Sequence, residues 1–302
     1  MKKVIVRLGN GLGNQLFIYA AGYAFAKKNK ADLYIDDESG FYKRYKYELH
    51  NFKISAQIIE KKYKFLGHFG RVKRKLQKRF STKNSFLVEE LDRQKLTYYN
   101  PEQFEKKFKD TLYFEGYFQS EKYFKNYEQS ILNEFTFKDH IEKEQPKKLM
   151  ENIKKSNSVS IHFRQEKFLK DENHKDLEKK NLEHLNNNME VINNGVKYFD
   201  KNIEKPVYFV WSNNYDNLAK FFPLNKFIHV KNNINKDPAY DLYLMSLCKH
   251  YILSPSTLHY WAAYLCRNKS KICLPPKKVR NNSGYYGFSN NKDIRPSWWK
   301  DI

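Results

Sequence analysis

The sequence lacks any run of about twenty apolar residues, the length that a helix needs to cross a bilayer. Its basic start, Met1-Lys2-Lys3, leads into an apolar stretch too short for the core of a signal peptide. Cysteine is scarce. Cys248, Cys266 and Cys273 are odd in number and lack the close spacing of metal ligands, so they predict neither a disulfide framework nor a zinc site. We therefore expect a cytoplasmic globular protein.

Acidic residues are few: 34 Asp and Glu stand against 56 Lys and Arg, which gives a net charge of +22. Such a charge calls for an anionic partner, and both nucleic acid and an anionic membrane surface are open. The 23 Tyr and 23 Phe favour a nucleic-acid-binding protein as the alternative from another class, because aromatic rings stack on bases. Against it, the aromatic residues are spread along the chain and no recognisable nucleic-acid module is present.

Residues 61–83 concentrate the positive charge, with ten basic side chains and no acidic one. Apolar residues recur there near helical spacing, which predicts a basic amphipathic helix. They are Phe65, Phe69, Val72, Leu76 and Phe80. Three interpretations stay open: the helix lies on an anionic membrane surface, lines a phosphate groove, or packs its apolar stripe on the core.

The N-terminal stretch predicts a strand, a glycine turn and a helix. Apolar residues from Val4 to Leu8 form a short run, and residues 9–13, GNGLG, break it before a helical pattern begins. Such a turn directs backbone N–H groups from a helix N-terminus toward an anion such as a diphosphate. A purely structural turn stays open, because Asn14 replaces the third glycine of a dinucleotide fingerprint and no Lys-Ser/Thr pair follows. The candidate donor-binding residues here are Asn10, Gly11, Gly13, Asn14 and Gln15.

Strand and helix patterns alternate, which predicts parallel α/β layers. Asp32–Asp36 continues the first layer, and Thr111–Tyr127 is typical of a strand that turns into a helix. The charged, apolar-poor stretch 141–157 marks a boundary, so we expect lobes at residues 1–150 and 151–302.

After this boundary the alternation restarts. Strands are expected at Ser158–Phe163, Val207–Trp211, Phe227–Val230 and Tyr251–Leu253, with helices near Met189–Phe199 and at Leu258–Leu265. In open parallel sheets, ligands bind outside the carboxyl ends of the strands. Arg164, Ser212 and Asn213 follow strands, so we expect them to face one site. Ser256 and Thr257 precede a helix and form a cap or an anion site.

Four sequence blocks, in the right order across the chain, resemble glycosyltransferase family 11, the α-1,2-fucosyltransferases. They read LGNGLGNQLFIYAAGYAFAKK, GYFQSEKYF, DLYLMSLCKHYILSPSTLHYWAAYL and DIRPSWWKDI. The resemblance implies a GT-B architecture, in which two Rossmann-like lobes, an N-terminal acceptor lobe and a C-terminal donor lobe, face a cleft. It also implies GDP-fucose as donor, inversion at the anomeric carbon, no metal, and a surface glycan or lipid-linked oligosaccharide as acceptor. The enzyme would then act on the cytoplasmic side of a membrane, where the basic segment can hold it near anionic lipid.

One block departs from the family pattern His-x-Arg-Arg-x-Asp. His162 and Arg164 match it, whereas Gln165 and Lys167 replace the second Arg and the Asp. Pro255 and His259 likewise stand where the family usually has Asn and Ser. These differences raise an alternative in which the same fold uses a different GDP-deoxysugar donor or is a weakened catalyst.

Sugar transfer from a nucleotide diphosphate builds charge on the leaving group, which needs a metal or fixed cationic and N–H donors. The nearest match to a metal-binding pair is Asp36-Asp37-Glu38, a pattern more typical of a loop or cap, so we expect no metal and no other cofactor. Arg164 suits the task because a guanidinium is always charged and grips phosphate bidentately, although an Arg at a strand end can also be a surface ion-pair residue. Helix N-termini near Gly13 and at Ser256-Thr257 are candidates for the remaining donors.

Two further residues are donor candidates. His162 sits in an apolar strand, where a core histidine is the default, while the resemblance implies that it faces the nucleotide base. Asp241 is a candidate to accept hydrogen bonds from guanine N1 and N2, or to cap the helix that it begins.

On the acceptor side the sequence identifies no single general base. Asp36, Asp37 and Glu115 are candidates by their position at strand ends. Tyr117 and Phe118 are candidates to stack on sugar faces, with core packing as the alternative.

Overall fold

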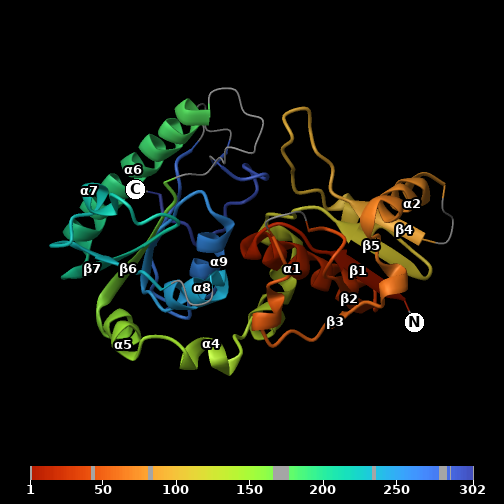
Figure 1. Ribbon diagram of the computed structural model, residues 1–302, viewed down its shortest axis with the longest axis horizontal. Helices are drawn as coiled ribbons and strands as arrows, with labels where there is room; N and C mark the ends of the chain where they lie inside the picture. Colours follow the sequence, from red (N-terminus) through yellow and green to blue (C-terminus); the bar gives the residue numbers. More distant parts are fainter. Residues whose placement is uncertain are drawn as a thin grey trace. The chain divides into compact units, whose positions relative to one another are not determined.

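The structure is a computed structural model that describes residues 2–41, 45–80, 84–165, 177–232, 236–278, 284–285 and 287–301. The chain forms two compact units (Figure 1). The first comprises Met1–Lys138 with Phe288–Pro296, and the second comprises Asp139–Gly287 with Ser297–Ile302. The sequence predictions for residues 81–83 and for Lys167 lie outside the described residues. None of the helices in the described ranges combines the length and hydropathy that a membrane span requires.

The division between the units differs from the predicted lobes 1–150 and 151–302. The polar stretch after Lys138 folds as part of the second unit, where Ile141 and Ile153 are completely buried. Gln145 donates a hydrogen bond to the Tyr240 carbonyl oxygen over 3.1 Å. Composition therefore misplaces the boundary because a few buried side chains anchor a mostly charged segment.

The first unit is built on a parallel sheet of order β3-β2-β1-β5-β4. Its strands are β1 (Lys3–Arg7), β2 (Asp32–Asp36), β3 (Gln57–Ile58), β4 (Asn84–Val88) and β5 (Thr111–Glu115). β1 lies in the centre because Val4, Ile5 and Val6 are apolar in succession and completely buried, as expected of a parallel strand covered on both faces. Helix α1 (Leu12–Lys28) packs so closely on it that a Cβ atom on Gly22 would lie 2.1 Å from Val6 Cγ1.

The remaining helices of the first unit are α2 and α3 and several short turns. α2 spans Gly67–Phe80 and α3 spans Glu128–Glu134. Single-turn 3-10 helices lie at Leu49–Asn51, Lys61–Tyr63, Glu102–Glu105, Glu121–Tyr123 and Lys125–Tyr127. The continuous helix predicted after Gly116 is wrong, because that stretch forms two 3-10 turns before α3 begins.

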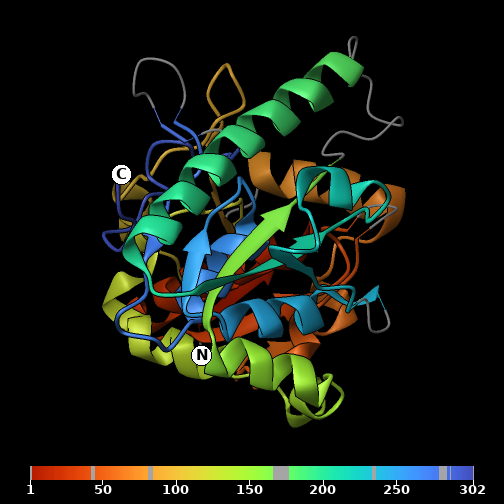
Figure 2. The same cartoon turned by 90° about the vertical axis from the view of Figure 1, so that its left-hand side faces the viewer.

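The second unit repeats the plan with a parallel sheet of order β10-β9-β6-β7-β8. Its strands are β6 (Asn157–Phe163), β7 (Pro206–Ser212), β8 (Phe227–His229), β9 (His250–Ile252) and β10 (Cys273–Leu274). Its helices are α4 (Asp139–Lys143), α5 (Lys147–Lys155), α6 (Leu177–Asn202), α7 (Leu218–Phe221), α8 (Pro238–Ser246) and α9 (Thr257–Leu265). Figure 2 shows α6 running across the strands. Ile192 and Phe199 of α6 pack in one core with Ile161 of β6. Two parallel α/β layers confirm the predicted α/β class.

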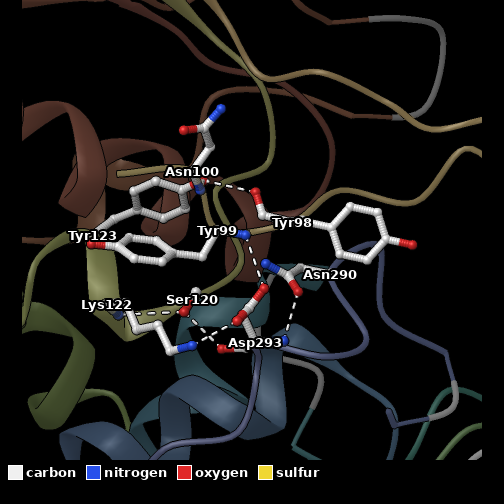
Figure 3. Close-up of polar contacts among 8 residues, drawn as sticks. All are labelled: Tyr98, Tyr99, Asn100, Ser120, Lys122, Tyr123, Asn290 and Asp293. Atoms are coloured by element: carbon white, nitrogen blue, oxygen red, sulfur yellow. Dashed lines mark hydrogen bonds and ion pairs between the residues drawn. The ribbon is translucent and has the colours of Figure 1, made fainter. Parts of the chain in front are cut away.

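The segment 288–296 returns to the first unit, and Asp293 holds it there (Figure 3). One carboxylate oxygen accepts a hydrogen bond from the Tyr99 backbone N–H over 2.9 Å, and the other lies 2.6 Å from Lys122 Nζ. Ser120 Oγ donates to the Asp293 carbonyl oxygen over 2.7 Å. The carboxylate is thus satisfied by a backbone donor and a cation at once.

Candidate active site

Three strands of the second unit end side by side and bring the predicted donor residues to one edge of the sheet. In the parallel register His162 pairs with Trp211, Phe163 with Ser212, and Ile161 with Ile252. The residues that follow these strands therefore share the carboxyl edge, where open parallel sheets bind ligands. They include Arg164, Asn213, Ser254, Ser256 and Thr257.

His162 is a buried, neutral histidine at this edge. Burial lowers its pKa to about 3, and the positive charge of the nearby Arg164 acts in the same direction. Its Nδ1 lies 3.5 Å from Ser254 Oγ. A neutral imidazole is suited to hydrogen bonding with an uncharged group, not to neutralising a phosphate.

His259 stabilises the loop that follows β9. Its Nε2 lies 3.0 Å from Ser160 Oγ, and the Ser254 backbone N–H donates to its Nδ1 over 3.3 Å. Burial lowers its pKa well below the usual value. The histidine that departs from the family pattern thus has a structural role and fixes Ser254 beside His162.

Gln165, the other described departure from the family pattern, ties two loops together. Its backbone N–H donates to Asn213 Oδ1 over 2.9 Å, and its Nε2 donates to the Asn214 carbonyl oxygen over 2.7 Å. Because these bonds occupy the amide, Gln165 shapes the edge without supplying charge. Arg164, which is partly exposed, is the cation of this block within the described residues.

Ser212 and Asn213 also hold the loop after β7. Ser212 Oγ donates to the Asn214 carbonyl oxygen over 2.6 Å and accepts from the Asn214 N–H over 3.3 Å. Asn213 Oδ1 accepts from Gln165, as described above. Both side chains lie where the sequence places them, and these bonds give both a structural role.

Asp241 Oδ1 is buried without a hydrogen-bond partner among the described residues, as are Asp36 Oδ2 and Glu89 Oε1 in the first unit. Burial raises its pKa to about 7. It lies close enough to Tyr215 to add to the effect of burial, which raises that phenol's pKa to about 12. The predicted capping role is wrong, because Asp237 caps α8 by accepting from the Ala239 N–H over 2.9 Å.

The start of α9 supplies a positive helix end at the same edge. Ser256 caps the helix, and its Oγ accepts from the His259 N–H over 3.4 Å. Thr257 is the first helical residue. The predicted cap is confirmed, and the N–H groups of the first turn are suited to an anion.

In the first unit, the glycine turn begins α1 as predicted. Gly11 is the N-cap residue and makes no side-chain cap hydrogen bond, while Asn10 adopts a left-handed conformation with φ 62°. Gly13 lies buried in the first turn. The Gln15 side chain is engaged within the fold: it is completely buried, donates to the Asn10 carbonyl oxygen over 2.9 Å and accepts from the Glu48 N–H over 2.9 Å. Donor binding by this helix N-terminus stays a prediction. The Asn14 Oδ1 atom accepts from Gln119 Nε2 over 2.8 Å.

The three carboxylates proposed as general bases are engaged elsewhere. Asp36 is completely buried, and its Oδ1 accepts backbone N–H groups of the following turn, so its assignment as base is wrong. Asp37 lies 2.5 Å from Lys64 Nζ. Burial alone would raise the pKa of Glu115, but the bidentate partner Arg74 outweighs it, and the pKa is lowered. A carboxylate with a lowered pKa is a weak proton acceptor.

A cavity of about 310 Å³ lies in the first unit at the carboxyl ends of β1, β4 and β5. It is lined in part by Arg7, Asn10, Glu89, Glu115 and Tyr117. Tyr117, predicted to stack on an acceptor sugar, thus lines a cavity. Its contact with a sugar stays a prediction. Stacking by Phe118 is wrong, because this ring is completely buried and stacks on Phe114 at a centroid distance of 4.2 Å.

Glu89 is the carboxylate that the sequence analysis misses. Its Oε2 accepts from the Tyr117 N–H over 2.6 Å and the Phe118 N–H over 2.9 Å, and burial raises its pKa. The close approach of Glu89 requires glycine at position 116, where φ is 157°. A Cβ atom there would lie only 2.4 Å from Glu89 Cβ and would clash with it. The sequence does contain a signal: the acidic pair Glu89-Glu90 directly follows the apolar end of β4, a strand that the sequence analysis does not predict.

Within the described ranges, no group of three or more His, Cys, Asp or Glu side chains is arranged to hold a metal ion.

Comparison with known proteins defines the class. Residues 3–299 match the sequence model of Glycosyl transferase family 11. The chain belongs to this family and is a glycosyltransferase. It is 26% identical over 289 residues to an α-1,2-colitosyltransferase of Escherichia coli, covering 91% of this chain and 92% of that one. It is 25% identical over 319 residues to the O-antigen biosynthesis glycosyltransferase WbnK of Escherichia coli, covering 96% and 98%.

Solved structures show the fold. NodZ, an α-1,6-fucosyltransferase soaked with GDP-fucose, matches with a TM-score of 0.53 at 14% identity, covering 87% of this chain and 92% of that chain. An Arabidopsis thaliana FUT1 mutant in complex with GDP matches with a TM-score of 0.55 at 13% identity, covering 92% and 71%. The predicted GT-B fold class is confirmed.

Proposed function

We propose that this chain transfers a fucose-type deoxysugar from a GDP-sugar to a hydroxyl group of an O-antigen-type surface glycan, forming an α-1,2 linkage with inversion and without a metal. The names of the two relatives support the glycan class. The GDP and GDP-fucose in the solved neighbours support the nucleotide. One of the relatives is named a colitosyltransferase, which supports a donor other than GDP-fucose as the alternative.

The observation that carries the proposal is the buried Asp241 oxygen without a hydrogen-bond partner among the described residues, in the first turn of α8 and near Tyr215 of the loop that follows β7. Guanine presents N1–H and the exocyclic amino group side by side, and one carboxylate accepts both, whereas adenine offers no such pair. Binding guanine would therefore satisfy an oxygen that has no hydrogen-bond partner among the described residues. Neutral His162 supplies an uncharged hydrogen-bonding ring at the carboxyl edge of the second sheet.

Arg164 and the N-terminus of α9 supply the positive groups for the diphosphate. In the proposed reaction the acceptor oxygen forms a bond to the anomeric carbon, the carbon–oxygen bond to the diphosphate breaks, and GDP leaves with the electron pair. The charge on the leaving oxygen grows as this bond breaks, so a fixed guanidinium stabilises the transition state more than the ground state. The acceptor proton passes to a base.

We assign the cavity of the first unit to the acceptor sugar and Glu89 to its proton. Its raised pKa makes this carboxylate a better proton acceptor than the ion-paired Glu115. Tyr117 lines the same cavity and offers a ring face to a sugar. Such a reaction belongs on the cytoplasmic side of the membrane.

Calorimetric titration tests the proposal directly. GDP, UDP, ADP and GDP-fucose are titrated into the purified protein with and without a chelator. Selective GDP binding that ignores the chelator is expected, and absence of binding by any nucleotide would contradict the donor site. Competition between GDP-fucose and GDP-colitose during turnover then separates the two donor hypotheses. A gel shift with single-stranded RNA at low and high salt tests the nucleic-acid alternative.

A further inference from the structure

Helix α2 presents its apolar stripe to solvent. Phe69 is 90% exposed, Phe80 68%, Leu76 54% and Val72 43%. These four account for half of the large apolar side chains found exposed in the described residues. Packing of this stripe on the core, one of the three interpretations left open by the sequence, is therefore wrong for these positions.

The opposite, polar side of α2 attaches it to the first unit. Arg74 forms a bidentate ion pair with Glu115 at the end of β5, with Nε 2.6 Å from Oε1, and Lys78 Nζ lies 3.4 Å from the same carboxylate. At the start of the helix, a Cβ atom on Gly70 would lie 2.4 Å from the Phe65 carbonyl carbon. Figure 1 shows α2 beside β4 and β5. A surface helix normally packs its apolar face inward, and here that arrangement is reversed.

Positive side chains flank the exposed stripe. The apolar positions follow each other at intervals of three, four and four residues, so they form one line along the helix. Exposed basic residues stand on both sides of it, Lys73 on one side and Lys75 and Arg79 on the other. The helix contains no acidic residue.

We infer that α2 docks the protein on an anionic lipid bilayer, with the apolar stripe in the boundary between headgroups and acyl chains and the flanking cations on lipid phosphates. An exposed apolar line bordered by Lys and Arg has the composition of an interfacial helix. A bilayer offers acyl chains to the apolar stripe and lipid phosphates to the flanking Lys and Arg side chains. Nucleic acid leaves the aliphatic Val72 and Leu76 in water, and a second copy brings two strongly basic helices together.

Vesicle flotation tests this inference with the full-length chain. Wild type is expected to float with vesicles of phosphatidylcholine mixed with phosphatidylglycerol, to remain behind with phosphatidylcholine alone, and to detach as salt rises. The double variant Lys73→Gln, Lys75→Gln is expected to bind roughly 25-fold more weakly, about fivefold per charge. The double variant Phe69→Ser, Phe80→Ser is expected to bind at least about tenfold more weakly.

Matched controls exclude general surface effects. Leu224→Ser removes an apolar residue that is 69% exposed in the second unit, and Lys154→Gln removes an exposed charge there. Both controls are expected to float like wild type, and thermal melts check that all variants fold.

Three results would overturn the inference. The first is that the α2 variants bind vesicles as tightly as wild type. The second is that neither wild type nor any variant binds lipid, while wild type binds RNA and the lysine variant does not. The third is that wild type does not bind vesicles but forms a dimer in sedimentation velocity, and the phenylalanine variant abolishes this dimer. None of these readouts involves GDP or a GDP-sugar, so failure of the proposed donor chemistry leaves this test unaffected.

Discussion

At the scale of single residues, Asp241 is expected to lower the stability of the folded protein while it favours binding of guanine. Its carboxyl pKa is raised to about 7 by burial, so the charged form is disfavoured in the empty fold. An acid whose folded pKa lies above its unfolded value stabilises the protein below the unfolded pKa and loses that contribution as the pH rises through the folded pKa. The protein therefore carries a cost above about pH 7 that a guanine ligand would relieve.

Replacement of this residue, Asp241→Asn, is expected to raise the Tm by roughly 2–5 °C at about pH 8, by less at about pH 5, and to leave it nearly unchanged at about pH 3, below the unfolded pKa. The same variant is expected to bind GDP at least about tenfold more weakly. Wild type is expected to bind GDP more tightly as the pH rises from about 6 to 8, and this pH dependence should be absent from the variant. Calorimetry at several pH values measures both effects. Asp237→Asn is the matched control, because Asn also caps a helix well. Unchanged GDP affinity in Asp241→Asn would contradict the guanine contact.

Arg164 is expected to act on the leaving diphosphate. Arg164→Ala should lower kcat about 10²–10³-fold, the usual cost of removing one donor to a developing charge, with little change in Tm. Arg164→Lys should keep the charge but lose the bidentate geometry, so its kcat should lie between those of wild type and Arg164→Ala. GDP release in a coupled assay gives the rates. Near-normal turnover in Arg164→Ala would exclude the proposed role.

Glu89 is expected to accept the proton of the acceptor hydroxyl. Glu89→Gln should lower kcat about 10²–10⁴-fold, remove the acidic limb of the pH–rate profile and leave GDP affinity unchanged. Its exposed neighbour provides the control Glu90→Gln. If Glu89 only holds the turn at Tyr117, the variant should lose stability and keep the pH profile.

At the scale of elements, the start of α9 separates capping from ligand binding. Ser256→Ala should cost about 1 kcal/mol of stability through loss of the cap. Ser256→Asp should keep the cap, since Asp is an equally good N-cap residue, but weaken GDP binding because a negative charge then stands where the diphosphate is proposed to bind. Thermal melts and GDP titration on both variants check this. Equal GDP affinity in wild type and Ser256→Asp would place the diphosphate elsewhere.

The sequence predicts those elements whose signal is local. β2 lies at Asp32–Asp36 as expected. Of the two central strands, β1 is recognisable because Val4, Ile5 and Val6 are apolar in succession, and β6 because apolar residues alternate with polar ones along it. Strands β3 and β10 contain two residues each, too few to show a period, and both were missed. α2 shows a further limit. Its apolar spacing identifies a stripe, but the direction of that stripe depends on the ion pair between Arg74 and Glu115, 41 positions away.

The same limit applies to the candidate site. Sequence order places Arg164, Ser212 and Ser256 at strand ends that do meet, because parallel strands align their carboxyl edges. It cannot show that the Gln15 amide and the Phe118 ring are completely buried, since burial depends on packing between distant segments.

At the scale of the whole molecule, the C-terminal stretch contributes to both units. Asp293 is bound in the first unit, while Trp299 is buried in the second, 6.1 Å from the ring of Tyr260. Removal of residues 288–302 is expected to destabilise both units and lower each calorimetric transition by roughly 10 °C or more, because a buried Trp alone contributes about 3–5 kcal/mol. Removal of the last two residues serves as control and should have little effect. A truncated chain that melts like wild type would show that this stretch is dispensable.

The path of the chain also limits how such enzymes can be recombined. The backbone passes from one unit to the other after Lys138, after Gly287 and again after Pro296. The second unit, to which we assign the nucleotide sugar, is therefore not contiguous in the sequence. A chimera joined at one point would place Asp293 or Trp299 against residues of the other parent enzyme. A graft intended to change donor preference has to exchange 139–287 together with 297–302, while the recipient keeps its own residues 288–296.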